Sequence, residues 1–268
     1  MLGKAFLASI LLISLSFSIS VVSPVTAGVD EDDVIDLGTI GPGQTVSILV
    51  DPIVTSGGVR GIGGTYDQAV AEDLPPGWKS TDSKLYQNPL QVTITADPNA
   101  PEGDYTAKVK VIDEFNGEEL GNVTFTVKIR VTWDVMDFDV SPEHRTAGPG
   151  QPAKFSITIL NKASTSDVFE VSAEGPKKWE FRKQVFVPPK STKTITYEIV
   201  GTEEEDYEAT IKVVSLASSN IADEKNVTLS VQSDLFGDYR ATNNGALIFP
   251  IFELPIYALA GLISNFIG

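Results

Sequence analysis

Apolar and polar side chains alternate along most of the chain, at the period-two spacing of half-buried β-strands. Pro, Gly, Asn and Asp punctuate these runs, and no convincing helical periodicity precedes the C-terminal segment. The clearest alternating runs lie at residues 46–50, 90–94, 105–111, 155–159, 195–199 and 207–213. The pattern therefore predicts an all-β protein built of short antiparallel strands.

The chain also contains an internal repeat of about a hundred residues. Gly41-Pro42-Gly43-Gln44 precedes one alternating run, and Gly148-Pro149-Gly150-Gln151 precedes another. The later matches, in the same order, are Trp78 with Trp179, Tyr105 with Tyr207, and Asn122 with Asn226. A repeat of this length is a duplicated domain. We therefore predict two tandem immunoglobulin-like antiparallel β-sandwiches, with each Trp packed between the sheets and each Tyr in a tyrosine corner.

The boundary between the two copies is predicted from a change in the phase of the buried residues. Residues 125–135 share one phase, whereas Met136, Phe138 and Val140 take the opposite one. A strand that changes its buried face leaves one core and enters another, so we place the boundary near Asp134. The predicted domains are residues 28–134 and 135–233, followed by a linker and attachment segment, 234–268. No Gly/Ser-rich linker intervenes, so we expect the domains to sit end to end with limited freedom.

The N-terminal residues predict secretion. Lys4 is followed by an apolar and hydroxyl-bearing stretch without charge up to Val22, and Val25-Thr26-Ala27 then offers small side chains. This pattern is typical of a signal peptide, residues 1–27, cleaved after Ala27. An uncleaved N-terminal anchor is the alternative. The protein is thus expected to be extracellular and associated with the cell surface, and without Cys its stability must come from burial and strand pairing.

Charge and composition exclude several classes of function. The formal net charge of −16 repels nucleic acids and anionic lipid headgroups, so neither is a charge-driven partner. His144 is the single histidine, and we expect it in a solvated loop and not in a catalytic triad. With one His and no Cys, a zinc site of ordinary ligands is excluded. We therefore expect no enzymatic activity, no catalytic residues and no cofactor.

Several local motifs resemble those of a known family. They are the two Pro-Gly turns, the segment Leu74-Pro75-Pro76-Gly77-Trp78, and the segment Ala100-Pro101-Glu102-Gly103-Asp104-Tyr105. These motifs, spread over roughly residues 31–232 in two copies, resemble the Ig-like modules of the NPCBM-associated (alpha-galactosidase-associated) family of archaeal and bacterial surface proteins. The resemblance implies non-catalytic modules with adhesive, spacer or carbohydrate-adjacent roles. The first copy adds a Gly-rich insert, residues 55–68, which we expect to be a mobile loop and a candidate binding surface.

Two sets of polar residues are candidate sites. Asp134, Asp137 and Asp139 cluster at the boundary, where a calcium ion could lock the domains because hard cations take carboxylate oxygens. They lack the Asp-x-Asp-x-Asp-Gly spacing of a calcium loop, so we favour solvated acids. The glycosylation sequons at Asn122 and Asn226 place Asn and Thr out of phase with the buried residues, so both should face solvent.

The last part of the chain, residues 246–268, is apolar, with Glu253 as its single charge. Pro250 and Pro255 interrupt it, and no Lys or Arg follows to hold a cytoplasmic end, which argues against a spanning helix. The residues after Pro255 follow helical i, i+3, i+4 spacing, and the predicted attachment residues are Ile256, Leu259, Ile263 and Phe266. Such a face favours attachment to the membrane or to a surface-layer component. Self-association and folding back onto its own domain are the second and third readings.

Together these features predict a secreted, non-enzymatic structural or adhesive protein of the cell surface, held at the envelope by its C-terminal tail. Two alternatives stay open. One is an extracellular carbohydrate-binding protein with a glycan as its partner. The other is a subunit of an extracellular filament or surface assembly that uses the tail for self-association.

Overall fold

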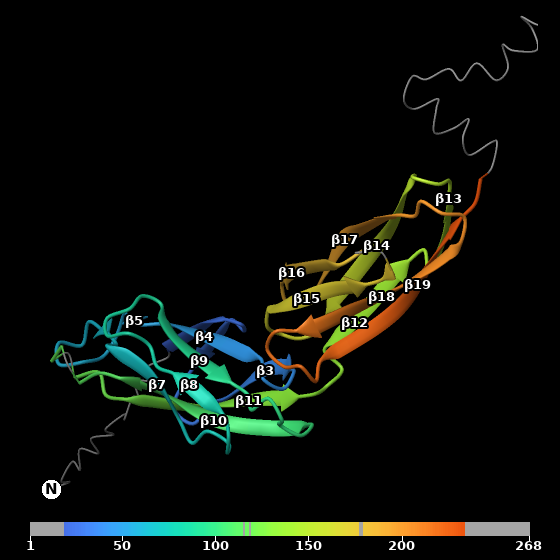
Figure 1. Ribbon diagram of the computed structural model, residues 1–268. Coiled ribbons are helices and arrows are strands. Elements are labelled where there is room, and N and C mark those ends of the chain that lie inside the picture. Colours follow the sequence, from blue (N-terminus) through green and yellow to red (C-terminus); the bar gives the residue numbers. More distant parts are fainter. Residues whose placement is uncertain (1–18, 115, 118, 177–178, 234–268) are drawn as a thin grey trace, which may run out of the picture.

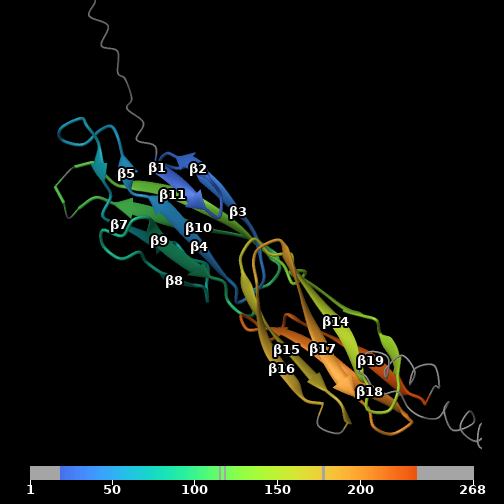
Figure 2. The ribbon, with the colours of Figure 1, turned by 90° about the horizontal axis from the view of Figure 1, so that it is seen from above.

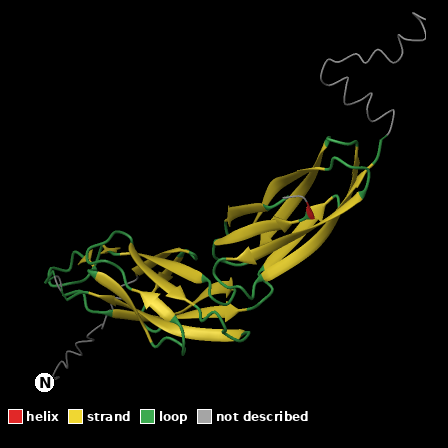
Figure 3. Cartoon of the chain, viewed as in Figure 1, coloured by secondary structure: helices red, strands yellow, loops and turns green. Residues whose placement is uncertain are grey.

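The computed structural model describes residues 19–233, apart from residues 115, 118, 177 and 178. Within this part the chain forms two bodies that lie end to end and are joined by a short segment (Figures 1 and 2). β-Strands make up nearly all of the regular structure of both bodies (Figure 3). The described residues contain no helix long and apolar enough to cross a membrane.

The first body is a sandwich of two sheets. Its strands are β1 (Ile19–Ser23), β2 (Ala27–Val29), β3 (Val34–Ile40), β4 (Thr45–Asp51), β5 (Ile53–Val54), β6 (Gly64–Thr65), β7 (Gln68–Glu72), β8 (Lys79–Thr81), β9 (Leu90–Thr95), β10 (Gly103–Ile112) and β11 (Val123–Val131). One sheet has the order β2-β1-β4-β9-β8, and the other has the order β3-β11-β10-β7. β5 and β6 form a separate small hairpin at the outer end of the sandwich (Figure 1).

The second body is also a sandwich of two sheets. Its strands are β12 (Met136–Ser141), β13 (His144–Ala147), β14 (Pro152–Asn161), β15 (Asp167–Glu174), β16 (Phe181–Val187), β17 (Ser191–Val200), β18 (Asp206–Ser215) and β19 (Ala222–Val231). The smaller sheet has the order β12-β14-β17, and the larger has the order β13-β19-β18-β15-β16.

In both sandwiches the N-terminal part of the domain is divided between the two sheets. β1 pairs antiparallel with β4, and β3 then pairs parallel with β11 in the other sheet. The second sandwich has the same arrangement: β12 pairs antiparallel with β14, and β13 then pairs parallel with β19 in the other sheet. All other pairings between neighbouring strands are antiparallel, as an immunoglobulin-like sandwich requires. The structure thus confirms the predicted all-β fold of two tandem immunoglobulin-like sandwiches.

Each sandwich encloses its own apolar core, because alternate residues of each strand point inward. β4 shows the rule: Val46, Ile48 and Val50 are buried, and the residues between them are partly exposed. Phe125 is among the largest buried side chains of the first core, and Phe155 and Phe169 are among those of the second. The two cores are separate, so each domain is stabilised mainly by its own burial.

The matched aromatic residues occupy equivalent places in the two cores, as predicted. The Tyr105 hydroxyl donates to the Pro101 carbonyl oxygen at 2.9 Å, and the Tyr207 hydroxyl donates to Glu203 O at 3.3 Å. In both cases the acceptor lies four residues earlier, which is the geometry of a tyrosine corner. The rings of these tyrosines pack on Trp78 and Trp179, with centroid distances of 5.1 and 5.0 Å.

The segment between the domains runs from Val131, the last core residue of the first sandwich, to Val135, which is buried in the second. The boundary predicted near Asp134 falls in this segment. Trp133 was predicted to share the phase of the buried residues, but its side chain is 40% exposed. The alternation fails there because β11 ends at Val131.

The first sandwich includes residues from Ile19 on, upstream of the predicted domain start at residue 28. β1 places Ile19 and Val21 in the core, where they are 1% and 0% exposed. The start at residue 28 followed from reading Val25-Thr26-Ala27 as the end of the leader, whereas residues 19–23 alternate as a strand and pair with β4. The remainder of the predicted signal peptide and the C-terminal segment 234–268, with its attachment residues, lie outside the described residues.

Candidate functional site at the junction of the two sandwiches

The junction of the two sandwiches is centred on the Gly-Pro-Gly-Gln turn between β3 and β4. Gln44 is 1% exposed there, although its side chain is polar. Its Oε1 accepts a hydrogen bond from the Gly41 N–H at 2.7 Å, which closes the turn. Its Nε2 donates to Oδ2 of Asp167, at the start of β15 in the second sandwich, at 2.6 Å. One side chain therefore shapes the turn and also binds the neighbouring domain.

Asp167 is the acceptor at the centre of this network and is 6% exposed. Besides Gln44, the Ser215 hydroxyl donates to Oδ2 at 2.7 Å, and the Val168 N–H donates to Oδ1 at 2.7 Å. A buried carboxylate is costly unless donors replace its water. Gln44, one of the three donors, belongs to the first sandwich. Asp167 therefore has all three hydrogen bonds only when the two domains are docked.

A second group of hydrogen bonds joins the edge of the first sandwich to the loop between β14 and β15. The Ser164 N–H donates to Thr39 O at 2.7 Å, and the Thr39 N–H donates back to the Ser164 hydroxyl at 3.0 Å. Next to this pair, the Thr165 hydroxyl donates to Thr45 O at 2.6 Å. These bonds involve backbone groups on both sides, so they fix the distance and the register between the domains.

Glycine at two positions of the turn allows the domains to approach each other. A Cβ at Gly43 would collide with the carbonyl oxygen of Ala217, and a Cβ at Gly41 would lie 2.6 Å from Ile221 Cδ1. Gly43 also has a φ of 72°, in the left-handed region that favours glycine. The equivalent Gly150 of the second sandwich has a φ of 76°, but nothing lies within 4 Å of its Cβ position. Among the described residues, the same turn therefore carries a docking contact only in the first copy.

The acidic residues at the boundary lie beside lysines. Lys162 Nζ contacts Oδ1 of both Asp134 and Asp137, the latter at 2.8 Å, and Lys225 Nζ lies 2.7 Å from Asp139 Oδ1. Hydrogen bonding to Lys225 lowers the pKa of Asp139. Within the described part of the chain no three His, Cys, Asp or Glu side chains are grouped as a metal would require. The predicted calcium ligands are thus arranged as ion pairs, and a calcium ion would have to displace Lys162.

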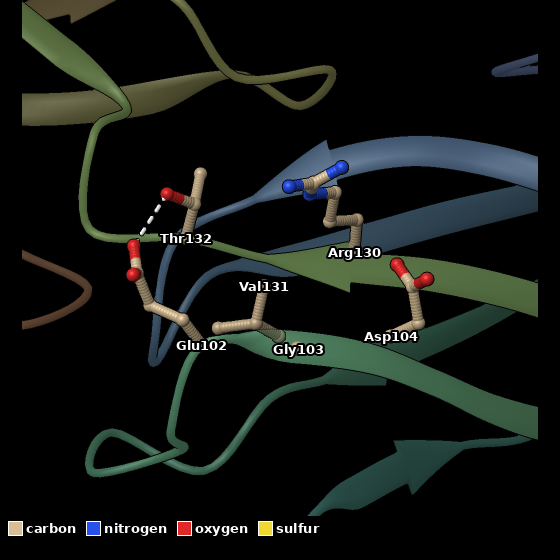
Figure 4. A pocket seen from close by; sticks show the side chains of 6 residues that line it. All are labelled: Glu102, Gly103, Asp104, Arg130, Val131 and Thr132. Carbon is tan, nitrogen blue, oxygen red and sulfur yellow. Dashed lines mark hydrogen bonds between the residues drawn. The ribbon is translucent and has the colours of Figure 1, made fainter.

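A shallow depression of about 270 Å³ lies beside the junction, at the ends of β10 and β11 (Figure 4). Glu102, Asp104, Arg130 and Thr132 are among its lining residues. Glu102 Oε1 accepts hydrogen bonds from the Thr132 hydroxyl at 2.6 Å and from the Trp133 N–H at 2.9 Å, and these two bonds lower its pKa. Through these two bonds Glu102 braces the segment that connects the two sandwiches.

The remaining predicted residues lie apart from the junction. His144 is exposed and lies in β13, not in the predicted loop, because residues 144–147 pair with β19. Asn122 and Asn226 are both exposed, as predicted; Asn122 directly precedes β11, and Asn226 lies within β19. Their amide oxygens accept from the Asp113 N–H at 3.1 Å and from the Thr210 hydroxyl at 2.9 Å.

The Gly-rich insert contains secondary structure that the sequence did not predict. β5 and β6 pair antiparallel through Ile53–Thr65 and Val54–Gly64, and an isolated parallel bridge joins Gly57 and Ile62 in the loop between them. Val59 and Ile62 near its tip are exposed. We call the segment from β5 to β6, residues 53–65, the insert hairpin. The hairpin lies at the end of the first sandwich that faces away from the second (Figure 1), so its exposed Val59 and Ile62 are found at that end.

Comparison with known proteins found no matching family model and no matching curated protein. Among solved structures, a chimeric titin Z1Z2 bearing an exogenous decorin peptide matches 82% of this chain and 99% of its own, with 10% identity and a TM-score of 0.36. The CARDB domain of a Pyrococcus furiosus protein, in complex with di-metal ions, matches 38% of this chain and 92% of its own (18% identity, TM-score 0.30). Similarities of this size add nothing to the fold established by the strand pairing.

The residues that join the domains were missed by sequence reasoning. Gln44 was noticed as part of a repeated turn, but Gln151 occupies the same place with no carboxylate partner in the described part of the chain. Asp167 is the first residue of an alternating strand, where an acid is ordinarily solvated. The available signal was Gly41 together with Gly43, because paired glycines in a turn often mark a close approach of the backbone.

Proposed function

We propose that this protein is a secreted, non-enzymatic spacer of the cell surface that is held at the envelope by its C-terminal segment. The observation that carries the proposal is the buried bond between Gln44 and Asp167, which couples the two sandwiches without a flexible linker. A two-domain body joined in this way resists bending, and a spacer needs this property. The resemblance to NPCBM-associated modules of surface proteins, noted in the sequence, supports the same role.

The positions of Ser233 and of the insert hairpin, at opposite ends of the pair of sandwiches, also support the proposal. Ser233, the last described residue, hydrogen-bonds to Glu204 at the outer end of the second sandwich. The insert hairpin lies at the opposite end of the pair of sandwiches (Figure 1). If residues 246–268 attach the protein, the insert hairpin is the part that extends farthest from the attachment point. Its exposed Val59 and Ile62 would then supply an adhesive contact.

The test is to fractionate cells that express the intact chain or a chain that ends before Ala241. We expect the intact protein in the envelope fraction and the shortened protein in the medium. The matched point variants are Ile263→Asp, on the predicted apolar face, and Ser264→Asp, off that face. The first should release the protein and the second should not.

Retention of the shortened chain in the envelope would refute attachment by the tail. Soluble oligomers that form without lipid, and that require residues 241–268, would favour the filament subunit instead. Binding of the shortened chain to a glycan panel would favour the carbohydrate-binding alternative. Envelope attachment, filament assembly and carbohydrate binding thus predict different results for the intact and the shortened chain.

A further inference from the structure

The first and second sandwiches begin with equivalent strands, as their registers show. Val21 of β1 lies opposite Val50, and Val140 of β12 lies opposite Ile157. Val50 and Ile157 are themselves equivalent, because each follows the Gln of its Gly-Pro-Gly-Gln turn at the same spacing. β1 is therefore the opening strand of the first domain, as β12 is of the second.

The residues that follow the two strands agree with this register. Ser23 lies opposite Leu49 and Ser141 lies opposite Ser156, again at equivalent positions of β4 and β14. Each of these serines follows a Val and precedes a Pro in the sequence. The duplication thus extends upstream of Ala27 and includes residues that the signal-peptide prediction had assigned to the leader.

β1 is also integral to the first sandwich. It lies between β2 and β4 in its sheet, and its Ile19 and Val21 are buried in the core. A cut after Ala27 would remove the whole of β1 and leave β4 as an open, apolar edge. The second sandwich, which keeps the equivalent strand β12, would have no such gap.

We propose that the leader is removed ahead of β1, by hydrolysis of the Ser18–Ile19 peptide bond. Water is added across this amide, so Ser18 becomes the carboxyl end of the leader and Ile19 becomes the new amino terminus. Ser16 and Ser18 supply the small side chains that signal peptidase requires three residues and one residue before the cut. Residues 5–17 also fit the usual apolar region of roughly 7–15 residues, whereas residues 5–22 exceed it. The inference rests on the secretion that the proposed function includes.

The first experiment is N-terminal sequencing of the full chain after export. We expect the sequence Ile19-Ser20-Val21-Val22. A start at Gly28, at any other residue after Ile19, or at Met1 in the exported protein would overturn the inference. Complete retention of the protein inside the cell would instead refute the secretion on which the proposed function depends. Ser18→Leu should block processing and Ala27→Leu should not, and the opposite result would again overturn the inference.

The second experiment measures the thermal unfolding of the exported protein with a substitution in β1. Val21→Asp places a charge in the core and should lower the unfolding midpoint by several degrees if β1 is retained. Val22→Asp is the matched control, because Val22 has the neighbouring place in the leader sequence but is 43% exposed in the sandwich. If cleavage removed β1, both variants would yield the same mature protein. Equal midpoints for Val21→Asp and the unsubstituted chain would therefore overturn the inference.

Discussion

Replacing Gln44 with Ala tests how the two sandwiches are held together. The substitution removes the donor to Asp167 Oδ2 at 2.6 Å and the acceptor of the Gly41 N–H at 2.7 Å. A hydrogen bond to a charged group contributes about 1.5–3 kcal/mol and a neutral one about 0.5–1.5 kcal/mol. Because the site is buried, water does not readily replace either bond. We therefore expect the free energy of unfolding to fall by about 2–4 kcal/mol.

Gln151→Ala is the matched control, since it changes the same residue of the same turn in the other sandwich. Gln151 is half-buried, and its Oε1 accepts from the Gly148 N–H at 3.3 Å, with no carboxylate partner among the described residues. We expect a loss below about 1 kcal/mol for this variant. Urea titration followed by far-ultraviolet circular dichroism measures both losses. Equal losses would refute the reasoning, because the difference between the variants depends on the bond to Asp167.

Further predictions concern the cores and the boundary. Tyr105→Phe and Tyr207→Phe should each reduce the free energy of unfolding by about 1 kcal/mol, and by the sum of the two when combined, because the tyrosine corners lie in separate cores; urea titration would expose any coupling between them. Burial, and then the charge of Asp113, raise the pKa of Tyr66 from 10.0 to about 12. Its neutral phenol therefore stabilises the fold below pH 10 and loses this effect as the pH rises through about 12. Thermal midpoints measured across that range should fall less steeply for Tyr66→Phe than for the unsubstituted chain. Because Lys162 pairs with Asp134 and Asp137, a chelator should leave the midpoint unchanged, and a drop that added calcium reverses would contradict this.

Much of the fold could be predicted from the sequence because strand alternation is a local property. Val46, Ile48 and Val50 are spaced for one face, and they are buried in β4 as expected. Because the sequence repeats, the same sandwich fold could be predicted for the second domain. Alternation was less informative at Trp133, where the strand had already ended, and the secondary structure of the insert hairpin was missed because its strands are only two residues long.

The junction could not be predicted because it depends on residues that are far apart in the sequence. Gln44 and Asp167 are separated by 123 positions, and nothing near either residue indicates that the two meet. The same difficulty affected the boundary acids. Asp134 and Asp137 raised the possibility of a cation site because they cluster at the boundary, and solvated acids were the favoured alternative. Neither reading anticipated their partner, Lys162, which comes from the loop after β14. Long-range contacts of this kind follow from how the domains dock and not from local pattern.

The Gly-Pro-Gly-Gln turn occurs twice, and among the described residues only the first copy contacts a neighbouring domain. At the outer end of the second sandwich, Gly150 has open space where Gly43 meets Ala217. Within the described residues, the second domain thus carries a turn of the same kind as the one that joins the two sandwiches, without a neighbouring domain docked on it. A third repeat could be appended there, by gene duplication or by grafting, if it supplied an acid at the position of Asp167 and a matching loop. Arrays longer than two units would then grow in length with no new way of joining.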